Sequence, residues 1–251
     1  MDVFSYHSYN SVSKRCTGAA ANAPPAHTPE AALSTDWLAR TEHDAYHYAA
    51  LRDRFEPGKP IWLTETGETG CGGNPWASTF TDTFRYVEQL GRVARLGVQV
   101  VMHNTLSASD YALIDEDTLE PRPNYWAALL WKRLMGTGVL HAGASPAPGV
   151  DLFAHCLAAT PGGVALVAVN TERVAAHELA LPMRGERYTL TSSAGLLSHS
   201  VELNGAALAL GKDGTVPVLR GAAAPAGTLS LPPASITFVA LAGADNPSCR
   251  S

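Results

Sequence analysis

A glutamate that ends an apolar segment and precedes a glycine-rich loop is the first candidate for chemistry. Residues 61–64 read Ile-Trp-Leu-Thr, Glu65 follows them, and four glycines occur between residues 67 and 73. In parallel sheets and barrels, substrate sites lie at the carboxyl ends of the strands. If residues 61–66 form such a strand, Glu65 is predicted to lie in a substrate site.

Polar side chains also end the two neighbouring strand-like segments. The segment 2–9 ends in His-Ser-Tyr, and the apolar run 98–102 is followed by His-Asn. Three consecutive parallel strands would present these groups at the same edge of a sheet. This pattern favours a substrate site, but by itself it leaves open that Glu65 is a solvated loop glutamate.

The segments between these strands have apolar residues at helical spacing. Helices are predicted over residues 36–55, 76–96 and 125–135. Strand and helix thus alternate three times, which is typical of a parallel α/β architecture. A closed eight-unit barrel takes about 250 residues, whereas these three units end by residue 136. They form either half of a small open sheet or the last part of a barrel.

The second half of the chain has a different pattern. Short apolar runs at residues 164–169, 188–190, 201–203 and 235–241 are separated by turn sequences such as Asn-Gly and Asp-Gly. No helical periodicity is evident there. An antiparallel β-sandwich is predicted, with an α/β domain over residues 1–137 and an all-β domain over residues 138–251.

Composition limits the partners and the compartment. The 251 residues include 18 Lys and Arg against 23 Asp and Glu, a net charge of −5, without a basic stripe. This disfavours nucleic acid and sulfated polysaccharides as partners. No apolar run approaches the roughly 18 residues of a membrane span, and the residues after Met1 do not form a signal peptide. The four cysteines allow three pairings or four free thiols.

Specific motifs now connect the chain to a known family. Residues 61–66, followed by Cys-Gly-Gly at 71–73, resemble the nucleophile strand and glycine loop of heparanase-like glycosidases, glycoside hydrolase family seventy-nine. Further matching motifs follow in order at residues 82–84, 89–91, 100–102, 110–113, 123–126, 129–137 and 197–205. The resemblance covers the family's carboxyl-terminal half. It implies the last three βα units of a (β/α)8 TIM barrel followed by a β-sandwich.

The resemblance implies retaining hydrolysis of β-glucuronides by two carboxylates about 5–5.5 Å apart. Glu65 stands at the position of the nucleophile. It must be ionised for that role, so hydrogen-bond donors are expected around it. His7 and Tyr9 are expected beside Glu65 and the sugar.

The glycine loop has a separate role by resemblance. Its backbone N–H groups are expected to hold the carboxylate of the sugar, with Gly70, Cys71 and Gly72 in the substrate site. Cys71 stands where the family has a glycine. Tyr111 corresponds to a tyrosine that contacts the same sugar, and Asp110 is expected in the same site.

No cofactor or metal is expected. His43 and His47 have the i, i+4 spacing of helical metal ligands, but no third ligand lies close in the sequence.

The second carboxylate of the family follows an asparagine, and no Asn-Glu pair occurs in this sequence. Neither Glu68, Asp110 nor Asp115 offers a fixed opposed geometry. Without an acid/base, the chain alone is expected to be nearly inactive on unactivated glycosides.

Three interpretations stay open. The chain is a fragment of an enzyme, a subunit whose partner supplies the missing amino-terminal half, or a non-catalytic protein that binds carbohydrate or a partner. The expected ligand is a glucuronide or a glycan that contains glucuronic acid. The lack of basic clusters favours small or neutral glucuronides over heparan sulfate.

The family also suggests how the cysteines pair. Cys156 and Cys249 match a pair that forms a bridge in animal heparanases. Cys16 and Cys71 follow adjacent predicted strands, and we predict a second bridge between them. Disulfides indicate an oxidising compartment, so a full-length form is expected to be secreted or extracytoplasmic.

Overall fold

The computed structural model describes residues 2–13, 15–16 and 28–250. The chain divides into two compact units, residues 1–124 and 125–251. The sequence pattern predicts the boundary between the two domains 13 residues further along the chain, between residues 137 and 138. The third helix accounts for the difference, because most of its residues fall in the second unit.

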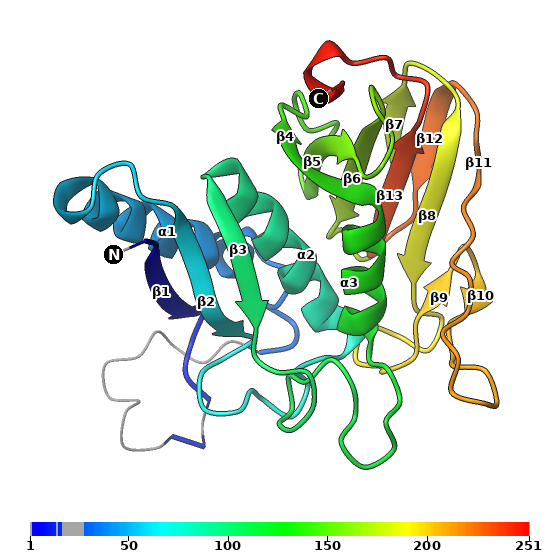
Figure 1. Cartoon of the computed structure of the whole chain (residues 1–251). Coiled ribbons are helices and arrows are strands. Elements are labelled where there is room, and N and C mark those ends of the chain that lie inside the picture. Colours follow the sequence, from blue (N-terminus) through cyan, green and yellow to red (C-terminus); the bar gives the residue numbers. More distant parts are fainter. Residues whose placement is uncertain (1, 14, 17–27, 251) are drawn as a thin grey trace. The chain divides into compact units, whose positions relative to one another are not determined.

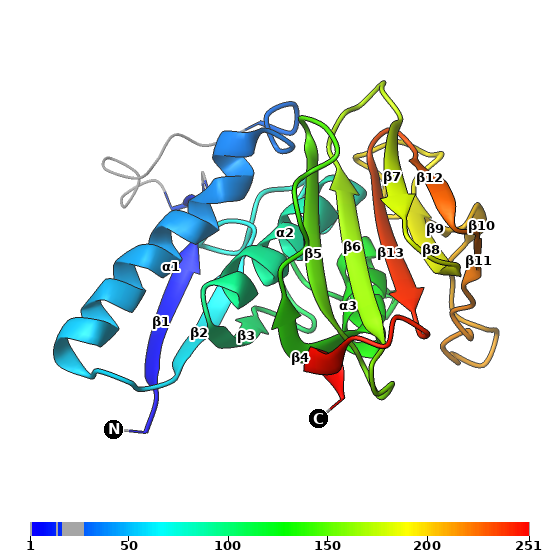
Figure 2. The same cartoon turned by 90° about the horizontal axis from the view of Figure 1, so that it is seen from above.

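The first unit is a three-stranded parallel sheet with helices on one face (Figures 1 and 2). In chain order its elements are β1 (Phe4–Tyr9), α1 (Thr35–Phe55), β2 (Ile61–Gly67), α2 (Phe80–Arg95) and β3 (Val98–His103). The strands lie in the order β1-β2-β3. The three predicted strands are therefore present, and strands consecutive in the sequence are neighbours in the sheet.

Alternation along the strands separates the two faces of this sheet. Tyr6 and Leu63 are buried with Ala45 of α1 and Val93 of α2 in one apolar core. The next residue of β1, His7, is exposed. The helices thus cover one face, and every second residue of β1 is directed to the other.

Helix α2 begins later than the periodicity predicted. Trp76 lies outside it, because the amide of Ala77 donates to the carbonyl of Asn74 in a turn (2.9 Å) and Thr79 occupies the N-cap position. The helix is buried on almost every side, including its charged residues Asp82, Arg85, Glu88 and Arg92.

The second unit consists of antiparallel sheets and one helix. Its elements are α3 (Pro123–Leu134), β4 (Met135–Leu140), β5 (Val150–Leu157), β6 (Val164–Asn170), β7 (His177–Leu181), β8 (Gly185–Thr191), β9 (Glu202–Leu203), β10 (Ala206–Ala207), β11 (Ala222–Ala224), β12 (Gly227–Leu231), β13 (Ser235–Leu241) and the 3-10 helix η2 (Pro247–Cys249). The larger sheet has the order β10-β9-β8-β13-β6-β5-β4, with β11 paired to β8. Strands β12 and β7 form a separate two-stranded sheet.

The larger sheet buries side chains on both faces. On one face, Leu152 and Val239 pack in one core with Leu179 of β7 and Leu229 of β12. On the other face, the ring of Trp131 from α3 lies edge-on to His155 and to Phe238. Burial on two faces explains the nearly continuous apolar sequence of β6 and β13.

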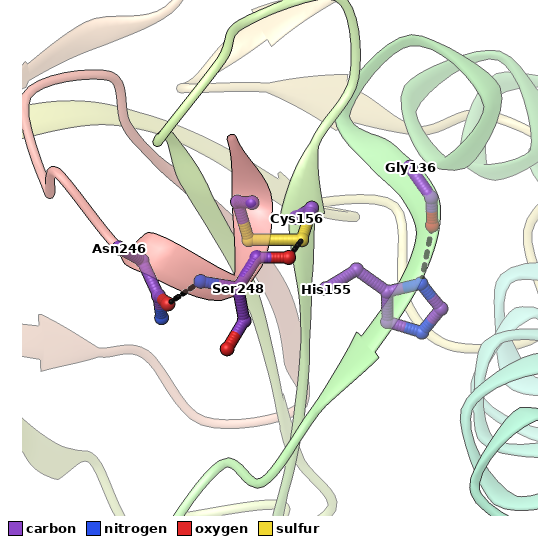
Figure 3. Close-up of a disulfide and its surroundings, with 6 residues drawn as sticks. Gly136, His155, Cys156, Asn246 and Ser248 are labelled. Carbon is purple, nitrogen blue, oxygen red and sulfur yellow. Dashed lines mark hydrogen bonds between the residues drawn. A yellow bond between two sulfur atoms is a disulfide. The ribbon is translucent and has the colours of Figure 1, made fainter. Parts of the chain in front are cut away.

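Both disulfides predicted from the sequence are present. Cys16–Cys71 lies in the first unit and Cys156–Cys249 in the second, with Cα atoms 6.1 and 5.3 Å apart. Figure 3 shows the second bridge, which joins β5 to η2. Beside it, His155 donates from Nδ1 to the carbonyl of Gly136 (2.7 Å).

Within residues 2–13, 15–16 and 28–250, no helix combines the length and the apolar character that crossing a bilayer requires.

Candidate functional site

Glu65 lies on the open face of the first unit's sheet because β2 contains an extra residue. Tyr6 pairs with Leu63 and His7 pairs with Glu65, so Thr64 has no counterpart in β1. Such a bulge reverses the alternation of side chains after it. Leu63 therefore faces the helices, whereas Glu65 lies beside His7 on the other face.

The carboxylate of Glu65 has a polar neighbour at each oxygen. The hydroxyl of Tyr9 donates to Oε1 at 2.8 Å, and Nδ1 of His7 lies 3.5 Å from Oε2. The Glu65 side chain is 40% exposed. The structure thus brings these three residues together, with the carboxylate open on one side.

Asn104 also holds the hydroxyl of Tyr9. The amide Nδ2 of Asn104 donates to the Tyr9 hydroxyl at 3.0 Å and to the Tyr111 hydroxyl at 3.4 Å. Burial raises the pKa of Tyr9 above its ordinary value, and the bond to Glu65 adds to this shift. The Tyr9 hydroxyl therefore stays protonated and donates a hydrogen bond to Glu65. The sequence pattern had marked Asn104 only as a strand end, without this contact.

The glycine loop packs against the two tyrosine rings. A Cβ atom at Gly67 would lie 3.0 Å from Tyr9 and from Tyr111, and one at Gly73 would lie 2.9 Å from Tyr111. Any side chain at these positions would displace a ring. The glycines therefore bring the loop backbone close to Glu65 and its neighbours.

Asp110 and His103 differ in position from the other strand-end residues. Asp110 forms an ion pair with Arg15 next to the glycine loop. The ring of His103 is turned toward α2, edge-on to Tyr86, and its Nε2 lies 2.8 Å from the carbonyl of Tyr111. Burial lowers the pKa of His103 to about 4, and the charge of Arg85 adds to this.

A buried glutamate lies at the base of the glycine loop. Glu68 is fully buried and accepts hydrogen bonds from Thr69 (2.8 Å), from the amide of Asn74 (2.9 Å) and from its side chain (3.0 Å). Burial raises the pKa of Glu68 to about 7, assisted by the negative charge of Asp82. Sequence reasoning weighed Glu68 only as an acid/base and gave no sign of this contact across the loop.

Among the described residues, no group of three or more His, Cys, Asp or Glu side chains could hold a metal ion.

Known proteins that resemble the chain are heparanases and related proteins. No family model matches it. It is 36% identical over 210 residues to heparanase of Gallus gallus, a match that covers 77% of this chain and 40% of the relative. The chain belongs to the heparanase-like family.

Two further relatives of the heparanase-like chain differ in the activity that their names give. It is 31% identical over 220 residues to inactive heparanase-2 of Homo sapiens, which covers 78% of the chain and 37% of that relative. It is 32% identical over 166 residues to baicalin-beta-D-glucuronidase of Scutellaria baicalensis, a match that covers 63% of this chain and 31% of that relative. The heparanase-like chain thus spans less than half the length of the curated relatives that it matches.

Solved structures show the fold of this heparanase-like chain. A 4-O-alpha-L-rhamnosyl-beta-D-glucuronidase from Fusarium oxysporum aligns with a TM-score of 0.66 at 15% identity, over 95% of this chain and 53% of that chain. An arabinofuranosidase of family GH51 from Xanthomonas axonopodis pv. citri aligns with a TM-score of 0.62 at 18% identity, over 96% and 53%. The chain therefore has the mixed α/β, TIM-barrel-like fold of these glycosidases.

Glu68 predicts how the stability of the heparanase-like chain depends on pH. Its folded pKa of about 7 lies above the ordinary value of 4.5, so between these values the folded protein holds more protons than the unfolded chain. The free energy of unfolding therefore falls as the pH rises through this window, and Glu68→Gln removes that fall. Relative to the wild type, the variant gains up to about 3 kcal/mol between about pH 4.5 and pH 7.5.

Urea unfolding at a series of pH values measures this difference. His103, with its lowered pKa, acts in the opposite direction, but it is present in both proteins and cancels in the comparison. Glu116→Gln, at an exposed position, is the matched control and should show no such change with pH. A difference between Glu68→Gln and the wild type that stays constant with pH would contradict the assignment.

Proposed function

We propose that this chain provides the nucleophile side of a retaining glycoside hydrolase that acts on β-glucuronides. One observation carries the proposal. Glu65, at the end of a parallel strand, accepts a hydrogen bond from Tyr9 and lies beside a glycine-rich loop, in a chain of the heparanase-like family. The names of the relatives, heparanase and a β-glucuronidase, support the class of substrate.

In this mechanism Glu65 attacks the anomeric carbon. One carboxylate oxygen forms the C–O bond of the glycosyl-enzyme while the bond from that carbon to the leaving oxygen breaks. Tyr9 donates to Oε1, which leaves Oε2 as the attacking atom and orients the carboxylate. Water later attacks the same carbon, gives a proton to the acid/base residue that the remaining units would supply, and releases Glu65 as a carboxylate.

The glycine loop is the proposed site of the sugar's own carboxylate. A turn rich in glycine directs successive N–H groups to one side, where they can bind an anion. We assign this role to the amides of Cys71 and Gly72, next to Tyr111, which packs against the loop. Gly70 was expected to take part as well, but its amide donates to the carbonyl of Ser11 (2.9 Å), so Gly70 supports the loop and does not donate to the sugar. A carboxylate bound there would distinguish a glucuronide from a glucoside.

The proposal also assigns an architecture. The three βα units would be the last part of a (β/α)8 barrel, followed by a β-sandwich, with the domains at residues 1–137 and 138–251. Within the described residues, β1 and β3 each pair on one side only. The remaining units, from the same polypeptide or from another chain, would supply the acid/base that protonates the leaving oxygen.

The proposed compartment follows from the disulfides. Two bridges within one chain are typical of proteins that fold in an oxidising environment. A secreted or extracytoplasmic enzyme fits this. Small or neutral glucuronides are the proposed substrates, since the chain has a net charge of −5 and no basic stripe.

A non-catalytic binding protein is the second candidate. The similarity to inactive heparanase-2, 31% over 220 residues, favours it. A ligand that labels the nucleophile separates the two, because only an enzyme forms a covalent bond to the sugar.

The test uses a 2-fluoro-glucuronide with an activated leaving group. The fluorine slows release of the glycosyl-enzyme, and the activated group leaves without protonation. The chain is first completed with the amino-terminal region of a heparanase. Mass spectrometry of the digest should then show one fluoroglucuronyl group on Glu65. Labelling of another residue would refute the assignment, and the absence of any label would favour the binding protein.

A further inference from the structure

Three segments that are distant in the sequence meet at the glycine loop. Residues 10–16 follow β1, residues 68–73 follow β2, and residues 104–111 follow β3. The described residues of all three lie at the carboxyl ends of their strands. The inference below rests on the proposed function, in which this loop binds the carboxylate of a sugar.

Backbone hydrogen bonds connect the glycine loop to both neighbours. The amide of Gly70 donates to the carbonyl of Ser11 (2.9 Å), and the amide of Ser13 donates to the carbonyl of Gly70 (3.0 Å). On the other side, the amide of Asp110 donates to the carbonyl of Gly72 (3.1 Å). Neighbouring chain segments thus hold both sides of the loop.

Two side-chain links reinforce the same arrangement. The disulfide Cys16–Cys71 joins the first segment to the loop across 55 residues of sequence. The adjacent residue, Arg15, forms an ion pair with Asp110 of the third segment. The guanidinium passes over Gly72, where a Cβ atom would lie 3.3 Å from Nη1. The disulfide therefore fixes Cys71, the residue directly before Gly72, where this close contact occurs.

The loop has a backbone that needs such support. Cys71 has a φ of 67°, followed by 87° at Gly72 and 85° at Gly73. Glycine adopts this left-handed region freely, but a residue with a Cβ atom does so at a cost. A strained conformation persists only where the surroundings determine it. At Cys71, the bond to Cys16 is such a constraint.

We propose that the Cys16–Cys71 disulfide is a positioning element that holds the glycine loop in the conformation that binds an anionic sugar. Loss of the bridge would free the loop at Cys71 and loosen its contacts with residues 11–13 and Asp110. Glu65 and its bond to Tyr9 would stay in place. The bridge would therefore control selectivity for a glucuronide over a neutral sugar.

Two double variants of the full chain distinguish two roles of the disulfide: positioning the glycine loop, and offsetting the backbone strain at Cys71. Cys16→Ser with Cys71→Ser removes the bridge and keeps a Cβ atom at position 71. Cys16→Ser with Cys71→Gly removes the bridge and restores the residue that accepts a positive φ. Cys156→Ser with Cys249→Ser is the matched control, because it removes a disulfide of the other unit.

Hydrogen exchange of the backbone amides is the first measurement, and it needs no ligand. Both variants at Cys16 and Cys71 should exchange at least about tenfold faster at the amides of Ser13, Gly70 and Asp110, whose hydrogen bonds hold the loop, with α2 unchanged. The control variant should leave the loop unchanged. Wild-type exchange in the loop of both variants would overturn the proposal. Wild-type exchange in the Cys71→Gly variant alone would also overturn it, because the bridge would then only offset strain.

Binding of glucuronate and of glucose, followed by NMR of the ligands, is the second measurement. The preference is the dissociation constant for glucose divided by that for glucuronate. In both variants this ratio should be at least about tenfold smaller than in the wild type, and an unchanged ratio would overturn the proposal. If the wild type shows no preference, the proposed sugar site fails, and the exchange data still decide the role of the bridge.

If neither variant folds, a dithiol can reduce the folded wild type. It supplies two electrons and two protons to Cys16 and Cys71 and becomes its own cyclic disulfide. The same exchange measurement then applies.

Discussion

Replacing Glu65 by glutamine in a completed enzyme should lower kcat by roughly 10⁴- to 10⁶-fold. The amide keeps the size of the side chain and can still accept the bond from Tyr9, but it cannot form the glycosyl-enzyme. Because the geometry of the site is preserved, the KM for a glucuronide should change little. Steady-state kinetics with an aryl glucuronide measures both quantities.

Rescue by azide distinguishes a nucleophile from a residue with a structural role. Glu65→Ala leaves space at the reaction centre, so added azide should restore turnover and yield a glucuronyl azide of inverted configuration. If Glu65 had only a structural role, azide would not restore turnover. Glu116→Gln, in an exposed loop, is the matched control and should keep full activity. If Glu65→Gln retains more than about a tenth of the activity, another group is the nucleophile.

The second large effect concerns the buried ion pair behind the site. Asp82 and Arg85 are almost fully buried, and Oδ1 of Asp82 lies 2.5 Å from Nε of Arg85. Asn124 donates to the same carboxylate at 2.6 Å. Burial alone would raise the pKa of Asp82, but Arg85 and these hydrogen bonds outweigh it and hold the pKa below its usual range. Asp82 is therefore a carboxylate, and Arg85 depends on its charge.

Asp82→Asn should lower the free energy of unfolding by about 3–5 kcal/mol, because it leaves the Arg85 charge buried without its partner. Chemical denaturation followed by fluorescence measures the loss. Asp53→Asn makes the same chemical change at a side chain that is 65% exposed, and it should cost less than about 1 kcal/mol. The double variant with Arg85→Met should recover part of the loss. Equal costs at positions 82 and 53 would contradict this account.

The sequence was informative where the signal is local. Apolar spacing within residues 36–55 and 98–102 depends only on neighbouring residues, and it predicted α1 and β3 closely. The order of strands and helices then placed the ends of β1, β2 and β3 together. The sequence pattern therefore predicts that Glu65, His7 and Tyr9 lie at the same edge of the sheet.

Contacts across the sequence could not be predicted in the same way. Glu68 and Asn74 meet across the glycine loop, and Asn124 reaches Asp82 from 42 residues away. Polar residues of this kind are normally exposed, so their burial follows only from the partners that the fold supplies.

Strands with mixed or glycine-rich sequences were also missed. Strand β4 contains Gly136 and Gly138, and a glycine after a helical pattern usually indicates the end of the helix and not a strand. In the structure a Cβ atom at Gly136 would lie 2.6 Å from the carbonyl oxygen of Cys156. Gly136 thus allows β4 to lie close to β5. This requirement comes from the tertiary structure, so the local sequence pattern does not reveal it.

The unpaired Thr64 has a consequence for how enzymes of this kind can be recognised. If β1 and β2 paired without the bulge, Glu65 would share the face of Leu63 and would point toward α1 and α2, into the interior. A search of related sequences that assumes strict alternation along the strand would therefore class this glutamate as an interior residue and overlook it. The irregular pairing at Thr64, as well as the letters of the strand, is part of the signature.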